Sequence, residues 1–365
     1  MKAMAKVTEL LKNRFFSGKK VNRTVSYLLV IFGYVLMIIL MKAGMLTSHF
    51  TSLLVPLTSY IVIAIALNLT VGFSGELSLG HAGFMGVGAF SAVIISGLLL
   101  PYVPNTTLRL IIAMLGAALV SSLFGAIIGI PVLKLEGDYL AIVTLAFNQI
   151  IKTIINSIYL GYDNNGIQIS FVKNKLNLGE GAVTILKGPI GANGIKRIST
   201  FTAGFILILI TLLVVYNLIY SRKGRDIMAC RDNRIAAESV GINVTNIKLE
   251  AFVISAALAG CAGALYGLNY STLTPAKFDY NLSIMILVYV VLGGLGNIAG
   301  TIISTVILYI LPEQLRFLQD YRMIIYAVVL IGIMLLTNNS WFKVQYYKIS
   351  KRIRKKMREK KGAAA

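Results

Sequence analysis

The sequence predicts an all-α, polytopic transmembrane bundle of about 8–10 membrane segments. Of its 365 residues, 57% are hydrophobic and only 13% are charged, against about 25% charged in an ordinary soluble domain. Apolar segments of about 18–22 residues recur along the chain, and a helix of that length crosses a hydrocarbon core about 30 Å thick. The Lys and Arg residues gather in clusters beside these segments, which is typical of membrane topology signals.

The apolar pattern predicts nine hydrophobic segments, one of which is too long for a single span. The segments are Val25–Ala43, Phe50–Val71, Ser78–Leu100, Leu108–Ile130, Tyr139–Leu160, Phe201–Tyr220, Ala251–Tyr270, Leu282–Leu311 and Arg322–Thr337. The long one, Leu282–Leu311, is interrupted by the run GGLGN at Gly293–Asn297. Dividing it there predicts two short pieces that are re-entrant or buried in the bundle. It also brings the total to ten membrane segments.

The charge distribution predicts which segments are cytoplasmic. Seven basic residues lie in Met1–Arg23, six in Arg222–Lys248 and ten in Lys343–Lys361, and basic clusters beside spans mark the cytoplasmic side. No small-residue cleavage pattern follows the first basic stretch, so the first apolar run is expected to be a retained helix rather than a removed signal peptide. We expect a basic cytoplasmic segment at 1–24, a transmembrane domain at 25–338 and a basic cytoplasmic tail at 339–365, with an external loop at 161–200 and a cytoplasmic loop at 221–250.

The chain lacks the motifs of several function classes. It contains no GxxxxGK[ST] run for ATP, no HExxH or GxSxG, and no cluster of His, Cys and carboxylates at metal-ligand spacing. His49 and His81 are too few for a metal site, and Cys230 and Cys261 show no disulfide or metal spacing. We therefore expect no catalytic residues, no metal, no cofactor and no enzyme activity. The net charge of +21 could suggest nucleic acid binding, but the clustering of the basic residues beside the spans favours a topology signal.

The stretch GFSGELSLGHAGFMGVGAF, Gly72–Phe90, places a carboxylate and a histidine among glycines between two apolar runs. Because glycine costs about 1 kcal/mol relative to alanine inside a helix, we expect a bend or an unwound link at Gly72–Gly80, with Ser78 able to cap the helix that restarts. Two interpretations of Glu76 stay open. It is a functional charge at a half-helix N-terminus, or it is a solvated residue in a turn at the cytoplasmic face, which the topology favours. His81 is expected to be a packed, hydrogen-bonding residue.

Small residues at helical spacing predict close helix packing. Gly260, Gly263 and Gly267 form one such stripe. Packing is the expected role of most of these residues, although a wall of small residues with few charges would also suit a zwitterionic solute. The candidates for helix breaks or for lining a path are Glu76, Ser78, Gly80, His81, Gly83, Gly293, Gly294, Gly296 and Asn297.

The basic loop at 221–250 predicts a short capped helix. Asp232 or Asn233 can cap its start, and Gly241 is a natural stop. Asn243 or Thr245 can then cap the helix that enters the membrane. Such a projecting helix is either a solvated connector at the headgroups or a docking element for a cytoplasmic partner.

Four sequence blocks together resemble the branched-chain amino acid permeases of ABC importers. They are the glycine-rich stretch above, GDYLAIVTLAF at Gly137–Phe147, VVLGGLGNIAGTIIS at Val290–Ser304, and AAESVGI at Ala236–Ile242, which is similar to an EAA-type coupling motif. The blocks occur in family order and cover most of Asn68–Leu311. The block GDYLAIVTLAF and the chain length favour the second, M-type, membrane subunit.

This resemblance implies a helical permease of the type II ABC-importer kind in a bacterial plasma (inner) membrane. It implies as partners a second homologous permease, two ATP-binding subunits, an extracytoplasmic solute-binding protein and membrane lipid, with no nucleic acid. The implied substrates are branched-chain or related amino acids, and urea and short amides stay open. The residues that the resemblance assigns to ATPase coupling are Asn233, Ala236, Ala237, Glu238 and Gly241.

A second class of function is an ion-coupled secondary transporter of a small solute, with Glu76 or His81 as the proton or cation site. It predicts transport that needs no ATPase partner and that is sensitive to Glu76→Gln. A co-purifying ATPase would favour the importer instead.

Overall fold

The structure is a computed structural model of the chain, and it describes residues 19–45, 47–133, 138–163, 166–171, 183–316 and 321–338. The tail expected at 339–365 and most of the segment expected at 1–24 lie outside the described residues. The chain divides into two compact units, Met1–Val306 and Ile307–Ala365.

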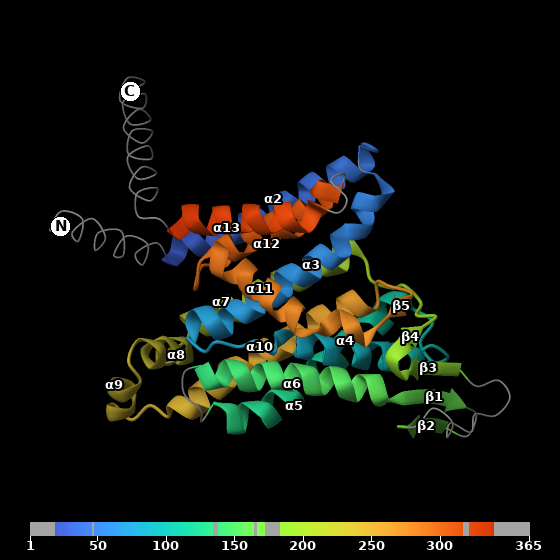
Figure 1. Cartoon of the computed structure of the whole chain (residues 1–365), viewed down its shortest axis with the longest axis horizontal. Coiled ribbons are helices and arrows are strands. Elements are labelled where there is room, and N and C mark those ends of the chain that lie inside the picture. Colours follow the sequence, from blue (N-terminus) through green and yellow to red (C-terminus); the bar gives the residue numbers. More distant parts are fainter. Residues whose placement is uncertain are drawn as a thin grey trace. The chain divides into compact units, whose positions relative to one another are not determined.

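Helices account for every membrane segment expected from the sequence (Figure 1). They are α2 (Lys19–Lys42), α3 (Ser48–Asn68), α4 (His81–Leu98), α5 (Thr106–Val132), α6 (Asp138–Ser157), α7 (Phe201–Tyr220), α10 (Val244–Gly267), α11 (Tyr280–Gly293), α12 (Ile298–Gln314) and α13 (Arg322–Asn338). Seven of the described helices are long and apolar enough to cross a membrane, whereas α11 and α12 are shorter apolar helices. The predicted helical bundle and the division of the long apolar segment are confirmed. The chain is a multi-pass membrane protein.

The loop expected at 161–200 contains strands that the sequence did not predict. The strands are β1 (Tyr159–Asp163), β2 (Gly166–Ser170), β3 (Val183–Lys187), β4 (Ala192–Asn193) and, after α10, β5 (Thr272–Leu273), in an antiparallel sheet of order β2-β1-β3-β4-β5. A strand of two residues carries no alternating pattern, and the partner of β4 follows α10 in the sequence. Local sequence therefore could not reveal this sheet.

Helix α10 packs along α3, α4 and α5 in the first unit. Because lipid tails are as apolar as leucine, membrane helices associate through close packing and hydrogen bonds rather than through hydrophobic burial. Glycines permit that approach here. The backbone of α4 at Gly88 meets that of α10 at Gly260, and Gly263 lies against the carbonyl oxygen of Met85. The small-residue stripe on α10 is thus a packing surface.

The second unit contains the last turns of α12 and the helix α13. Four aliphatic side chains on α13 are exposed and recur every three or four residues: Ile324, Val328, Ile331 and Leu335. They form an exposed apolar stripe along the helix, as suits a helix in contact with lipid.

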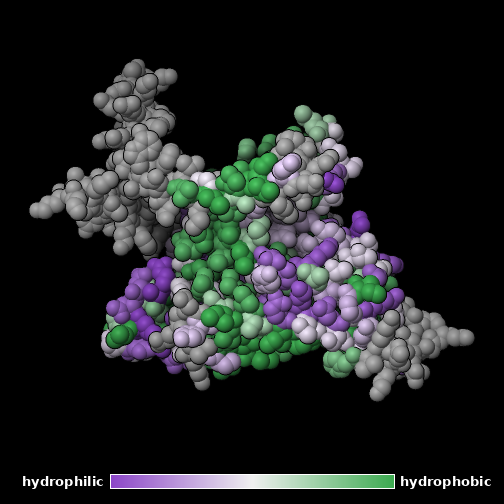
Figure 2. Space-filling model, in the orientation of Figure 1, coloured by the Kyte–Doolittle hydropathy of each residue, from purple (hydrophilic) through white to green (hydrophobic). Residues whose placement is uncertain are grey.

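Two polar regions lie at opposite ends of the first unit (Figure 1). One end carries two further helices, α8 (Arg222–Asp232) and α9 (Arg234–Ser239), and the other carries the strands. Figure 2 shows hydrophilic surface over α8 and α9 and again towards the strands, with hydrophobic surface between them. A protein whose polar loops lie on opposite sides of a membrane needs apolar surface between its two polar regions.

Gly263→Val should destabilise the bundle, because a Cβ at this position would collide with the carbonyl oxygen of Met85. Overpacking of this kind costs about 1–3 kcal/mol, so we expect a lower thermal midpoint for the purified protein in detergent. Gly33→Val in α2 is the matched control, since no atom lies within 4 Å of a Cβ added there. An unchanged midpoint for Gly263→Val would contradict the close approach of α4 and α10.

Candidate functional site

The basic loop begins with α8 and α9 and leads into α10. The side-chain oxygen of Asn233 caps α9 by accepting from the backbone N–H of Ala236 at 3.0 Å. Asn243 caps α10 in the same way, accepting from the N–H of Asn246 at 3.1 Å. The short capped helix expected from the sequence is confirmed, with Asn233 as its N-cap, and Asn243 is the N-cap of the helix that follows.

A Schellman motif ends α9. Gly241 has a φ of 84°, which glycine adopts without the strain that a Cβ would add. Its N–H donates to the carbonyl oxygen of Glu238 at 3.0 Å. The next N–H, of Ile242, donates to the carbonyl oxygen of Ala237 at 3.1 Å. Gly241 is therefore the stop that the sequence predicts.

One side of α9 packs against its neighbours. Ala237 is 3% exposed and forms a small core with Cys230 of α8 and Val244 of α10, beside the partly buried Ile242 and Ile247. The expectation that Ala237 contacts an ATPase directly is corrected, because its side chain faces inward. Its small size lets α9 lie close to α8 and α10.

The other side of α9 faces outward and includes two apolar side chains. Ile235 is 79% exposed and Val240 is 74% exposed, and Ala236 is also exposed. Glu238 pairs with Arg234 one turn earlier on the helix, at 3.0 Å. The sequence did not single out Ile235 or Val240, because their exposure becomes evident only when the inner side of this short helix is known.

The helix break expected at Gly72–Gly80 is present. A π-helical turn, η1 (Leu69–Phe73), follows α3, and the chain is non-helical from there until α4 begins at His81. Glu76 forms an ion pair with Lys248 of α10, and each side chain is only 13% exposed. The interpretation of Glu76 as a solvated residue is therefore wrong, because α10 supplies a partner that the local sequence does not show.

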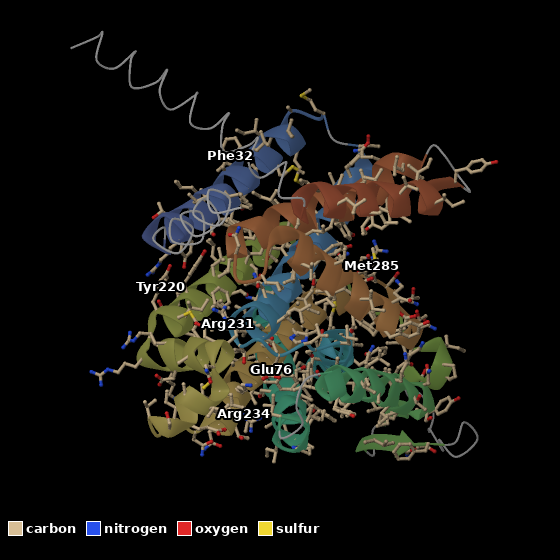
Figure 3. All side chains as sticks on the ribbon, turned by 60° about the vertical axis from the view of Figure 1, so that its left-hand side comes forward. Phe32, Glu76, Tyr220, Arg231, Arg234 and Met285 are labelled. Atoms are coloured by element: carbon tan, nitrogen blue, oxygen red, sulfur yellow. The ribbon has the colours of Figure 1, made fainter. Side chains whose placement is uncertain are left out.

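A second basic residue reaches this link from α8. Arg231 donates through Nη1 to the carbonyl oxygen of Gly72 at 3.0 Å. Its aliphatic stem lies against Gly75, where a Cβ would come within 2.5 Å of Arg231 Cγ. Figure 3 shows Arg231 near Glu76. The link therefore contacts both α8 and α10.

A chain of hydrogen bonds holds His81 at the start of α4. Its Nδ1 lies 3.1 Å from Ser78 Oγ, and its Nε2 lies 2.7 Å from Ser255 Oγ of α10. Ser255 donates its own proton to the carbonyl oxygen of Ala66 in α3 at 2.5 Å, so its oxygen accepts from Nε2 and Ser78 donates to Nδ1. His81 is buried, neutral and hydrogen-bonded at both ring nitrogens, which confirms that it is a packed residue.

Ser78 does not cap α4, contrary to the prediction. Gly80 occupies the N-cap position, and Ser78 is 1% exposed, with its hydroxyl on the ring of His81. The Ser78 hydroxyl donates to the imidazole nitrogen, and its oxygen accepts a long bond of 3.5 Å from the N–H of Gly80, the N-cap residue itself. Ser78 therefore lies too early in the chain to cap the first turn of α4.

Gly80 and Gly83 lie where α4 approaches α6. A Cβ at Gly80 would lie 2.9 Å from the carbonyl oxygen of Thr144, and one at Gly83 would lie 3.1 Å from Asn148 Oδ1. Both distances are shorter than ordinary contacts of a real Cβ. These two path candidates are packing positions in the structure.

The second break separates α11 from α12. Gly294 and Gly296 have φ values of 93° and 76°, and a Cβ at Gly293 would lie 2.5 Å from the backbone of α12. Asn297 caps α12, since its Oδ1 accepts from the N–H of Gly300 at 3.3 Å. The run GGLGN thus contains a turn that needs glycine and a residue that restarts the helix.

Asn68, the last residue of α3, joins the two breaks. Its Oδ1 accepts from the N–H of Gly296 at 2.9 Å, and its Nδ2 donates to Thr301 Oγ1 in α12 at 2.8 Å. Asn68 is fully buried, and Gly72 also lies against Gly296. The sequence did not single out Asn68; an amide at the end of an apolar run beside a glycine-rich stretch was the available signal.

These features define the class of the protein. Discontinuous helices inside a bundle of membrane-length helices are typical of membrane transport proteins. Among the described residues, no three His, Cys, Asp or Glu side chains gather closely enough to hold a metal ion. The family model for the permease component of branched-chain amino acid transport systems matches residues 49–336. The chain belongs to this family.

Several curated relatives are permeases of such systems. The high-affinity branched-chain amino acid transport system permease protein LivM of Salmonella typhimurium is 32% identical over 289 residues, which cover 76% of this chain and 66% of the relative. LivM of Escherichia coli is 30% identical over 286 residues with the same coverage. LivH of Salmonella typhimurium is 26% identical over 263 residues, which cover 69% of this chain and 80% of the relative.

The higher identity to the two LivM proteins confirms the resemblance to the M-type subunit. The matched part of the chain spans slightly less than two thirds of the length of these LivM proteins. No solved structure matches the chain significantly.

Asn68→Leu should destabilise the protein more than Thr301→Val. The first change leaves the N–H of Gly296 without its acceptor, and an unmet backbone donor away from water costs about 1–3 kcal/mol. The second change removes the acceptor for Asn68 Nδ2 and a donor to the carbonyl oxygen of Asn297, which still accepts from the backbone N–H of Thr301. Thermal midpoints in detergent measure both effects, and equal shifts would contradict the assignment of Gly296 as the main partner.

Proposed function

We propose that this chain is the M-type permease subunit of an ATP-driven importer for branched-chain or related amino acids. The observation that carries the proposal is α9, a capped helix at a polar end of the bundle that exposes Ile235 and Val240. Apolar side chains exposed in polar surroundings suit an interaction site. In this proposal α9 seats in a groove of an ATP-binding subunit, and nucleotide-driven closure turns the permeases between inward- and outward-facing states.

Each residue assigned to coupling has a role in this docking surface. Asn233 and Gly241 determine where α9 begins and ends, and Ala236 permits close approach of the partner. Glu238 offers a polar contact at the rim and is held by its ion pair with Arg234. Ala237 acts indirectly, by keeping α9 packed on its neighbours.

The proposed assembly contains a second homologous permease, two ATP-binding subunits and an extracytoplasmic solute-binding protein. Similarity to both LivM and LivH supports two related but distinct permeases. The permease domain at 25–338 would lie in a bacterial plasma membrane with both termini cytoplasmic, because the basic clusters beside spans favour that side.

The proposed substrates are leucine-like amino acids, which the names of the relatives support. In such an assembly the binding protein selects the solute and ATP hydrolysis supplies the work. The permease then needs only a weakly binding path, and small residues with few charges suit an apolar zwitterion.

An ion-coupled transporter has less support from the geometry. A transported ion would need an accessible carboxylate, whereas Glu76 is paired with Lys248 and is only 13% exposed. Both ring nitrogens of His81 are engaged by serine hydroxyls. These two residues therefore have structural partners in place of a transported ion.

Ile235→Asp and Val240→Asp should each weaken docking of the ATP-binding subunits. A carboxylate placed in an apolar contact loses that contact and must be desolvated, so we expect recovery of the ATPase with the solubilised chain to fall about fivefold or more. Quantitative co-purification measures this. Ile190→Asp is the matched control, because Ile190 is 57% exposed but lies near the strands. If no ATPase co-purifies with the wild-type chain, the importer proposal fails.

Uptake of labelled leucine into proteoliposomes that contain the whole assembly should require ATP on the side of α9. It should persist when a protonophore collapses the proton gradient, since ATP hydrolysis supplies the work. Isoleucine and valine should compete for uptake, and urea and acetamide should not. Leucine uptake by the permeases alone, abolished by the protonophore, would support the ion-coupled alternative instead.

A further inference from the structure

Two basic side chains, one on α8 and one on α10, contact the glycine-rich link between α3 and α4. Arg231, near the end of α8, donates to the carbonyl oxygen of Gly72. Lys248, in the first turns of α10, pairs with Glu76. Neither Arg231 nor Lys248 lies on the outward side of α9. Docking of a partner on that side therefore does not by itself account for their contacts.

The pair between Lys248 and Glu76 is less exposed than the ion pair that joins α8 to α10. Lys223 of α8 and Glu250 of α10 also meet, at 2.7 Å, but their side chains are 58% and 42% exposed. Exposed pairs of that kind contribute little. Separating a pair that is only 13% exposed on each side leaves a poorly solvated charge, so the link and the start of α10 are held together.

Arg231 makes a directed contact. Its Nε and Nη2 donate to Asp232 Oδ1 at 3.1 and 2.8 Å, which fixes the plane of the guanidinium. Its Nη1 is then aimed at the carbonyl oxygen of Gly72, inside the π-helical turn η1. A charged donor makes this bond stronger than one between neutral groups, and π-helical turns are frequent at functional positions.

From Ser74 to Gly80 the link contains no helix that a displacement would have to unwind, and Gly75 has a φ of 78°. Hinges of this kind absorb dihedral changes at the ends of elements. Because Gly72 lies against Gly296, a displacement of the link also reaches the second break.

We propose that Arg231 and Lys248 are positioning residues that transmit movement of α9 to the link at Gly72–Gly80 and thereby to both helix breaks. The inference rests on the proposed function and names the contacts through which a docked ATPase acts on the bundle. Because α9 packs on α8 and α10 through Ala237, a displaced α9 carries both basic residues with it.

The test is the number of leucine molecules taken up per ATP hydrolysed by the complete assembly in proteoliposomes. The variant Glu76→Gln/Lys248→Met removes both charges and leaves none unpaired, so it should fold and bind the ATPase. We expect it to retain at least about half of the hydrolysis rate and to lose about tenfold in leucine taken up per ATP. The charge-swapped variant Glu76→Lys/Lys248→Glu should restore that ratio to within about threefold of the wild type.

Arg231→Met should uncouple hydrolysis from uptake in the same way, and Lys223→Met is the matched control for both. Lys223 joins α8 to α10 through its exposed pair with Glu250. The number of leucine molecules taken up per ATP should therefore stay within about twofold of the wild type. If a neutral variant takes up as many leucine molecules per ATP as the wild type, this inference alone is overturned. This holds whether the rates of uptake and hydrolysis are both unchanged or both fall in proportion. Failure of the wild-type chain to bind an ATPase overturns the proposed function and this inference together.

Discussion

Backbone that leaves a helix inside a membrane protein must find hydrogen-bond partners within the protein, and the rest of this structure depends on how Asn68 meets that constraint. Its amide accepts from the N–H of Gly296 and donates to the hydroxyl of Thr301. Without that amide, the turn between α11 and α12 would carry an unmet donor against the end of α3. The same residue brings the two glycine-rich breaks into contact, so the two non-helical regions form one unit.

Short polar side chains join the other central helices in a similar way. Ser78, His81 and Ser255 form a chain that ends on the backbone of Ala66 and so connects the link, α4, α10 and α3. Glycines along α4 and α10 bring the backbones close enough for such short side chains to reach. In a membrane, where apolar burial gives helices little reason to associate, these contacts help to define which helices lie together.

The region of α8 and α9 combines a rigid element with two connections to the bundle. Caps at both ends and the small core around Ala237 give α9 a defined position. Arg231 and Lys248 then connect its supporting helices to the non-helical link. In the proposed function, this arrangement gives a docked ATP-binding subunit a connection through charged contacts to the glycine-rich link.

The sequence by itself determined the membrane class, the membrane helices, both breaks and the capped helix, because each depends on composition, periodicity or capping within a few residues. Asn233 and Gly241 could be identified for that reason. The family followed separately, from the resemblance of four sequence blocks to known permeases. Only the tertiary structure decided that Glu76 pairs with Lys248, that Ser78 hydrogen-bonds to His81, and which side of α9 is exposed. Lys248 lies 172 positions from Glu76 in the sequence, and the sheet pairs β4 with a strand beyond α10. Such partners are chosen by packing, and no local pattern records them.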